Sequence, residues 1–165
     1  MPAIDRLRCS AGVKLMSLFY EDFEVGQVFD SPGRTVTDTD LSMFCMLSGD
    51  WHPLHSDEEY AKTTQFGRRV VGGVFGVALV TGAMSRWGIF EASVIAMLSI
   101  DGWRFAGPIY VGDTLRVRMT ITGKRLTKSG STGIIDREFE IRNQRDELVQ
   151  SGRSDALIKL RSDNT

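Results

Sequence analysis

The sequence predicts a single α+β domain in which one long helix packs against a curved antiparallel sheet. Residues 70–89, VVGGVFGVALVTGAMSRWGI, are apolar almost throughout, which is typical of a helix buried on nearly every side. After residue 93 the apolar period changes to that of strands, and turn-forming clusters separate the strand-like runs. A chain of 165 residues, with no linker or internal repeat in its sequence, is long enough for one such core.

Short elements are expected before the long helix. Residues 27–36, QVFDSPGRTV, have the β-branched residues and the Gly/Pro punctuation of a short strand and turn. A first helix should follow Thr37, a suitable N-cap with Asp38 and Asp40 in the first turn, and should end at Gly49. The residues after Gly49 are then held at the end of a helix.

A second short helix is expected directly after His55. Ser56 and Glu59 have the spacing of a capping box, in which each side chain accepts a hydrogen bond from the backbone of the other residue. Pro53 fixes its own φ angle and restricts His52. The loop between the two helices should therefore be stiff.

The second half of the chain predicts long antiparallel strands. Four strand-like runs cover residues 93–105, 114–125, 133–142 and 148–160. In the second run apolar and polar residues alternate, as expected of a strand with one buried face: Leu115, Val117, Met119 and Ile121 alternate with Arg116, Arg118, Thr120 and Thr122.

The apolar segment 70–89 could also be read as a membrane span. Its uninterrupted apolar part is only about fifteen residues, against the ~20 that a bilayer requires. Arg68, Arg69 and Arg86 flank it, and several glycines interrupt it. A helix in the core of a soluble domain is the better interpretation.

Composition restricts the class of partner. Twenty basic and twenty-one acidic residues give a net charge of −1, so no global field attracts nucleic acid or an anionic membrane. Two cysteines, Cys9 and Cys45, cannot form a disulfide framework, which favours a reducing, cytoplasmic setting. Residues 1–15 are expected to be a flexible extension, and the folded domain to occupy residues 16–165.

Both histidines of the chain lie close to an aspartate in residues 48–60, SGDWHPLHSDEEY. Asp50, His52 and His55 could divide general acid and general base work near neutral pH. Taken singly, Asp50 and His55 are more typical of hydrogen-bonded turn residues. A metal site built from the three is a weaker interpretation, because side chains of one stiff loop rarely converge on one point.

Residues 48–57, SGDWHPLHSD, resemble the hydratase signature of MaoC-like dehydratases and (R)-specific enoyl-CoA hydratases. The resemblance continues in FYEDFEVGQVF, FGRRVVGG and RFAGPIYVGDTLRVRMTI, and covers residues 20–160. It implies a hot-dog fold, with Asp50 and His55 as the catalytic pair. It also implies that the backbone N–H of Gly73, at the start of the long helix, receives the thioester oxygen, in keeping with the free N–H groups of a helix N-terminus.

The resemblance extends to residues around the catalytic pair. Trp51, His52, Gly72 and Thr81 are candidate substrate-binding residues. Thr81 lies where the family often has a serine that helps fix the catalytic groups. Two positions depart from the family pattern, since His52 stands where asparagine is usual and Gly72 where a histidine often precedes the oxyanion glycine.

The function that the resemblance implies is a lyase that reversibly hydrates a trans-2-enoyl-CoA to an (R)-3-hydroxyacyl-CoA. It requires no metal or redox cofactor, because coenzyme A is part of the substrate, and it implies a homodimer or an assembly of dimers. The alternatives are a hot-dog acyl-CoA thioesterase and a non-catalytic acyl-CoA-binding subunit. Four basic residues are candidates for the coenzyme A phosphates, although each is individually more typical of a solvated surface: Arg68, Arg69, Lys124 and Arg125.

Overall fold

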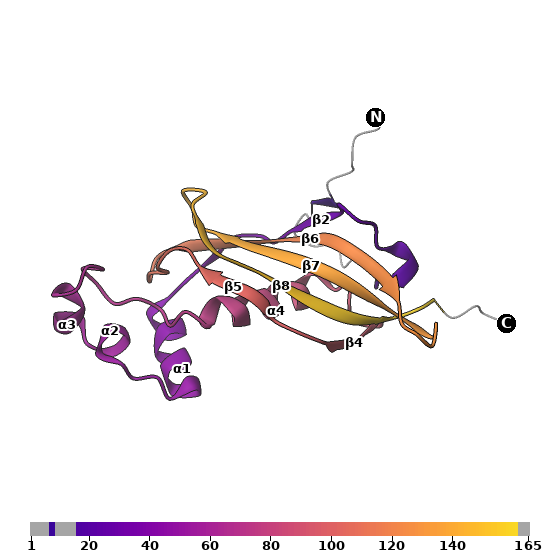
Figure 1. The fold of residues 1–165 in the computed structure, drawn as a ribbon. Coiled ribbons are helices and arrows are strands. Elements are labelled where there is room, and N and C mark those ends of the chain that lie inside the picture. The colour runs from indigo at the N-terminus through magenta and orange to yellow at the C-terminus, as the bar shows by residue number, and fades with distance from the viewer. Residues whose placement is uncertain (1–6, 9–15, 162–165) are drawn as a thin grey trace.

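The computed structural model describes residues 7–8 and 16–161 as one curved antiparallel sheet with a helix, α4 (Phe75–Trp87), against its inner face (Figure 1). The strand order is β1-β2-β6-β7-β8-β4, with β3 also paired to β6 and β5 to β8. The strands are β1 (Leu7–Arg8), β2 (Val28–Asp30), β3 (Arg34–Thr35), β4 (Val94–Met97), β5 (Asp101–Phe105), β6 (Thr114–Leu126), β7 (Thr132–Arg142) and β8 (Leu148–Lys159). This arrangement confirms the predicted α+β class and the hot-dog fold.

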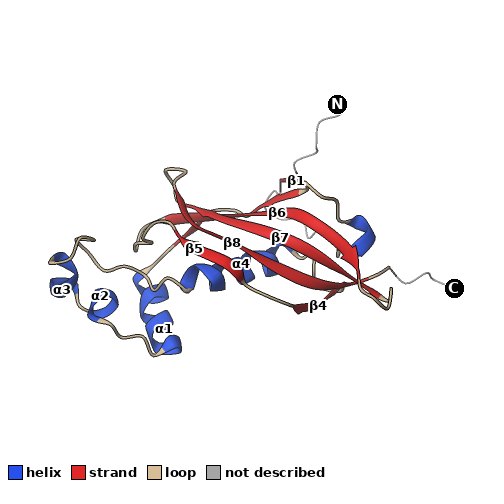
Figure 2. Ribbon diagram, viewed as in Figure 1, coloured by secondary structure: helices blue, strands red, loops and turns tan. Residues whose placement is uncertain are grey.

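The remaining helices are short and lie beyond one end of the sheet. Figure 2 shows α1, α2 and α3 gathered there, next to the end of α4 at which that helix begins. Their bounds are Asp38–Ser48 for α1, Pro53–Ser56 for α2 and Glu58–Lys62 for α3, and a 3₁₀ turn covers Tyr20–Asp22. The predicted extension, residues 1–15, lies outside the described residues except for β1, which pairs with β2 in parallel.

The caps predicted for α1 are confirmed. The hydroxyl of Thr37 accepts a hydrogen bond from the backbone N–H of Asp40 at 3.2 Å, and Gly49 ends the helix with a φ angle of 73°. Glycine adopts this left-handed conformation without steric cost, whereas a side chain there would be strained. The direction in which the chain leaves α1 is thereby fixed.

The capping box predicted at Ser56 is wrong. The residue that caps α3 is Asp57, whose carboxylate accepts a hydrogen bond from the N–H of Tyr60 at 3.0 Å. Ser56 instead ends α2, and its hydroxyl donates to the carbonyl oxygen of Trp51 at 3.1 Å. The reason is Pro53, which starts a helix of its own at the first helical position and so places Ser56 in the last turn.

The helix predicted for residues 70–89 is shorter than expected. Residues 70–72 form a non-helical lead-in, in which Val70 bridges to Tyr110 and the N–H of Val71 donates to Ile109 at 2.9 Å, and residues 73–74 form a turn. The expected burial on nearly every side is also wrong for the single chain, because one side of α4 is exposed at Ala78 and Thr81. A helix that rests on one sheet buries only the side that faces that sheet.

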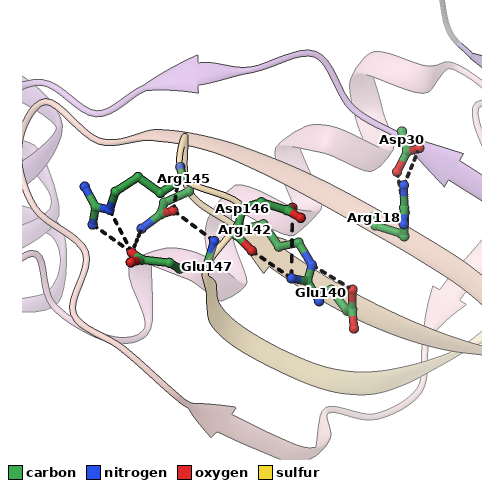
Figure 3. A network of polar contacts seen from close by, with 8 residues as sticks. Asp30, Arg118, Glu140, Arg142, Arg145, Asp146 and Glu147 are labelled. Atoms are coloured by element: carbon green, nitrogen blue, oxygen red, sulfur yellow. Dashed lines mark hydrogen bonds and ion pairs between the residues drawn. The ribbon is translucent and has the colours of Figure 1, made fainter.

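The strand predictions hold for three of the four runs. The run 93–105 is instead two strands, β4 and β5, which both pair with β8. In β6 the alternation confirms the predicted faces, since Leu115, Val117, Met119 and Ile121 are all buried. The outer face of the sheet carries ion pairs such as Arg118 with Asp30 (Figure 3).

The core lies between α4 and the inner face of the sheet. Its largest fully buried apolar side chains include Trp87, Phe23, Phe29 and Phe139. One charged residue, Arg137, is also buried in this layer at 2% exposure. Within residues 7–8 and 16–161, no helix is long and apolar enough to cross a membrane.

Candidate active site

Asp50 and His55 are brought together by the turn between α1 and α2. The left-handed Gly49 turns the chain, and the N–H of His52 then donates to Oδ1 of Asp50 at 3.2 Å. The α2 helix turns His55 back towards this carboxylate, so that Nε2 of His55 lies 3.6 Å from Oδ2 of Asp50. The imidazole is largely enclosed, at 14% side-chain exposure, whereas the carboxylate is 55% exposed.

A backbone carbonyl fixes the ring of His55. Its Nδ1 lies 2.6 Å from the carbonyl oxygen of Val70. A carbonyl oxygen only accepts hydrogen bonds, so Nδ1 carries the proton and Nε2 of the neutral ring has a free lone pair. Val70 is held in turn by its bridge to Tyr110 and by its N–H, which donates to Leu54 at 3.2 Å.

His52 stabilises the same turn. Its Nδ1 accepts a hydrogen bond from the N–H of Leu54 at 3.1 Å, which makes His52 the N-cap of α2. Its ring also meets the rings of His55 and Tyr60 edge-on, with centroids 6.2 Å and 6.0 Å away. The short side chain of asparagine can accept the same capping bond, so the departure at this position preserves the cap.

Gly73, predicted to lie at the start of the long helix, lies two residues before α4 begins at Phe75. The peptides on both sides of Gly73 are anchored: the carbonyl of Gly72 accepts from the N–H of Phe75 at 2.9 Å, and the carbonyl of Gly73 accepts from Nε2 of Gln150 at 2.9 Å. No residue in the described ranges accepts a hydrogen bond from the N–H of Gly73. This donor is therefore available to a ligand.

His55 and Gly73 line one cavity of about 350 Å³. Its walls are otherwise mainly apolar, from Phe66, Val71 and Phe105, and the amide of Gln150 is a further polar group. The ring of Phe105 lies directly over Gly73, since a Cβ built on that glycine would be 3.1 Å from it. A basic imidazole nitrogen and a free N–H donor thus share a small, largely apolar space.

The other predicted substrate-binding residues lie elsewhere. Trp51 is 54% exposed, and the hydroxyl of Thr81 donates to the carbonyl of Ala78 within α4. Neither residue lines the cavity, and Gly72 faces the ring of Phe44. Sequence reasoning missed Gln150, for which the one local signal is a long polar side chain on the strand face that also carries Gly152, Ala156 and Ile158.

Most of the basic residues proposed for coenzyme A already have partners. Arg69 pairs with Asp38 and Glu58, and Arg125 pairs with Asp136 and Asp155. Lys124 donates to two backbone carbonyls, those of Tyr20 and Phe23. Arg68, in contrast, stacks on the ring of Tyr110 at 4.0 Å, close to the segment that carries Phe66 and Val70.

A second cavity, of about 410 Å³, lies between α1, α4 and β6. Its lining is mostly apolar and contains no histidine or cysteine. Two of its three ionisable residues, Arg34 and Asp40, pair with each other, and the pKa of Asp40 is lowered by its hydrogen bonds to Thr37 and by Arg34 in spite of partial burial, which opposes the shift. The groups for acid–base chemistry are therefore found in the smaller cavity.

Comparisons with known proteins identify relatives of this chain. The chain is 35% identical over 64% of its length to protein MaoC of Klebsiella aerogenes, and 29% identical over 64% of its length to an (R)-specific enoyl-CoA hydratase of Rhodospirillum rubrum. It spans 31% of the former protein and 70% of the latter, and less than half of several other curated relatives. A structure described as a monoamine oxidase regulatory protein from Archaeoglobus fulgius superposes with a TM-score of 0.84 at 30% identity, over 90% of this chain and 99% of that one.

The match to a family model covers the whole turn and every residue that lines the cavity except Gln150. The model of the MaoC-like domain matches residues 22–140, which include Asp50, His55 and Gly73. The match extends from the 3₁₀ turn before β2 into β7. The chain therefore belongs to the MaoC-like dehydratase family.

Proposed function

We propose that this chain is a hydro-lyase that reversibly hydrates a trans-2-enoyl-CoA to an (R)-3-hydroxyacyl-CoA. The observation that carries the proposal is the placement of His55, with a free Nε2 lone pair, in the same cavity as the unbonded N–H of Gly73. The (R)-specific enoyl-CoA hydratase of Rhodospirillum rubrum, a relative of this chain, is named for this activity.

The geometry suits the activation of one water molecule. The 3.6 Å between Nε2 of His55 and Oδ2 of Asp50 is too long for a direct hydrogen bond, but one water can donate a hydrogen bond to each atom. In hydration, one of these acceptors takes a proton as the water oxygen attacks C3 of the enoyl group. The pair then returns a proton to C2, which conserves the protons of the reaction.

Attack at C3 moves an electron pair towards the thioester oxygen. The N–H of Gly73 can donate a hydrogen bond to this developing enolate, in a cavity whose apolar walls strengthen the interaction. A single N–H donor of this kind accounts for about 10²- to 10³-fold in rate. The dehydration direction uses the same groups in reverse.

The test is an assay of the purified protein with a panel of short, medium and branched trans-2-enoyl-CoA thioesters. Loss of the enoyl absorbance without release of free thiol is the expected result. Thiol release would instead identify a thioesterase, and tight binding without turnover would identify a non-catalytic acyl-CoA-binding subunit. Chiral analysis of the product tests the (R) configuration.

We also propose that two copies of the chain pair through β4 and β5. These strands form the β8-side edge of the sheet, and large apolar side chains on them and in the loop between them are 40–57% exposed. The residues are Val94, Ile95, Met97, Leu98, Ile100 and Phe105. An uncovered apolar edge of this length is a site for strand pairing with a second copy.

Sedimentation velocity tests the assembly. The mass of the native protein in solution should be twice the 18.4 kDa of the chain or a multiple of this dimer mass. Met97→Glu should shift the mass towards that of the monomer. Leu126→Glu is the matched control, because Leu126 is similarly exposed at the far end of β6. A monomeric native protein would contradict the proposal.

A further inference from the structure

Gln150 is a buried polar residue of the cavity, and the reaction proposed above gives it no role. It lies on β8, 77 residues from Gly73 in sequence, and is 1% exposed. Its amide nonetheless lines the cavity that holds His55 and Gly73. Resting on the function proposed above, we propose that Gln150 is a positioning residue: it holds the carbonyl of Gly73, next to the peptide that carries the Gly73 N–H, and so keeps this N–H aimed at the substrate oxygen.

Two hydrogen bonds fix the orientation of the Gln150 amide. Oε1 accepts from Nε1 of Trp103 at 3.0 Å, and Nε2 donates to the carbonyl of Gly73 at 2.9 Å. The indole N–H is only a donor and the carbonyl only an acceptor, so the reverse orientation would lose both bonds. Trp103 therefore determines which end of the amide faces Gly73.

Close packing also holds the Gln150 amide and the Trp103 ring in place. A Cβ on Gly76 would lie 2.1 Å from Oε1 of Gln150, and a Cβ on Gly152 would lie 2.2 Å from the ring of Trp103. Each glycine thus leaves the space that the neighbouring side chain fills. The amide and the indole are packed between α4 and β8 as well as hydrogen-bonded.

Such a clamp is needed because Gly72 and Gly73 are adjacent. Two consecutive glycines have wide backbone freedom, and ordering them costs more entropy than ordering other residues. The bond from Phe75 to the carbonyl of Gly72 holds the peptide that carries the Gly73 N–H. Gln150, together with the N–H of Gly76 at 3.2 Å, holds the next peptide through the carbonyl of Gly73. With both peptides fixed, the N–H direction is set before the substrate binds, as an oxyanion donor requires.

The first test is Gln150→Met, which keeps the length of the side chain and removes both hydrogen bonds. We expect kcat for enoyl-CoA hydration to fall by about 10- to 100-fold, with KM changed little, because a misdirected donor is lost mainly in the transition state. Gln144→Met is the matched control. Gln144 also makes two hydrogen bonds, to the N–H of Thr114 and to Asp113, but lies away from the cavity.

The second test, Gln150→Glu, separates positioning from simple stability. When ionised, the introduced carboxylate would face the carbonyl oxygen of Gly73 and repel it. When protonated, its O–H can donate to that oxygen while its other oxygen accepts from Trp103. We therefore expect the activity of the variant, divided by that of the native protein at the same pH, to rise as pH falls. Taking this ratio removes any pH dependence that the two proteins share.

Trp103→Phe completes the series, because it keeps a ring over Gly152 but removes the donor to Oε1. A smaller fall in kcat than in Gln150→Met is expected. If Gln150→Met fails to fold, the pH dependence of Gln150→Glu decides the question. Native kcat with a flat activity ratio in Gln150→Glu would overturn the role of Gln150 and leave the proposed function standing. A native protein that does not hydrate any enoyl-CoA would overturn both.

Discussion

Nε2 of His55 lies 3.6 Å from Oδ2 of Asp50, across a turn in which each residue is held by a separate backbone contact. The N–H of His52 orients the carboxylate, and the carbonyl of Val70 orients the imidazole. Neither side chain depends on the other for its position. A substrate or water between them therefore meets two prearranged groups.

Replacing Asp50 should abolish most of the activity without changing the fold. Asp50→Asn keeps the shape of the side chain and can still accept from the N–H of His52, but the amide cannot take up a proton. We expect kcat/KM for enoyl-CoA hydration to fall by about 10²- to 10⁴-fold, measured as initial rates. Asp57→Asn is the control, since asparagine also caps a helix and activity should stay within about twofold. Equal losses in both variants would contradict the catalytic role of Asp50.

The capping role of His52 predicts that asparagine is a better replacement than alanine. His52→Ala removes the acceptor for the N–H of Leu54 and should lower the free energy of unfolding by about 1 kcal/mol, whereas His52→Asn should change it by a few tenths. Denaturant unfolding measures the difference. Identical stability of the two variants would show that the bond from Leu54 contributes nothing.

Two glycines of α4 should respond to alanine in opposite directions. Gly76→Ala places a Cβ against the Gln150 amide and should destabilise the protein by about 1–3 kcal/mol while lowering kcat. Gly82→Ala meets no atom within 4 Å and should stabilise the helix by about 0.5–1 kcal/mol at unchanged kcat. Thermal unfolding and initial rates test both expectations. A stabilised, fully active Gly76→Ala protein would show that the packing at this position is loose.

Arg137 should make stability depend on pH in the alkaline range. Its Nε donates to the carbonyl of Ser154 at 2.9 Å and Nη1 lies 3.0 Å from the sulfur of Met84, with Asp155 the carboxylate that acts on its charge. Burial lowers the pKa of Arg137 to about 10, and Asp155 opposes this shift. The unfolded chain therefore binds the proton more tightly, which costs the folded state about 3 kcal/mol at neutral pH.

The sign of this effect follows from proton binding. Above the folded-state pKa of about 10 and below the higher pKa of the unfolded state, the unfolded state carries more protons, so the penalty decreases as pH rises. The quantity to measure is the difference in free energy of unfolding, Arg137→Met minus the native protein. This difference should fall by about 1 kcal/mol between about pH 8 and about pH 10.5. Urea unfolding at both pH values measures it. Arg153→Met, on the exposed face of β8, should show no such trend.

The local signals in the sequence determined the elements and the catalytic turn. Thr37 and Gly49 mark the ends of α1 because a cap acts on its own backbone, and the alternation from Leu115 to Ile121 defines the inner face of β6. The spacing of Asp50 and His55 in one stiff turn made their meeting predictable. Where two local signals competed, the sequence was ambiguous, and Pro53 displaced the cap expected at Ser56.

Only the tertiary structure decided how these groups are aimed. The carbonyl of Val70 sets the tautomer of His55 over 15 residues of separation, and Gln150 reaches Gly73 over 77. Trp103, which orients Gln150, lies on β5, and the sequence predicted β5 and β4 as one continuous strand. Hydrogen bonds between distant segments depend on which strands pair and in which register, and neither is encoded in the local pattern of either segment. The sequence by itself thus determined which residues are proposed for the chemistry, and the curved sheet around α4 decided where their donors and acceptors point.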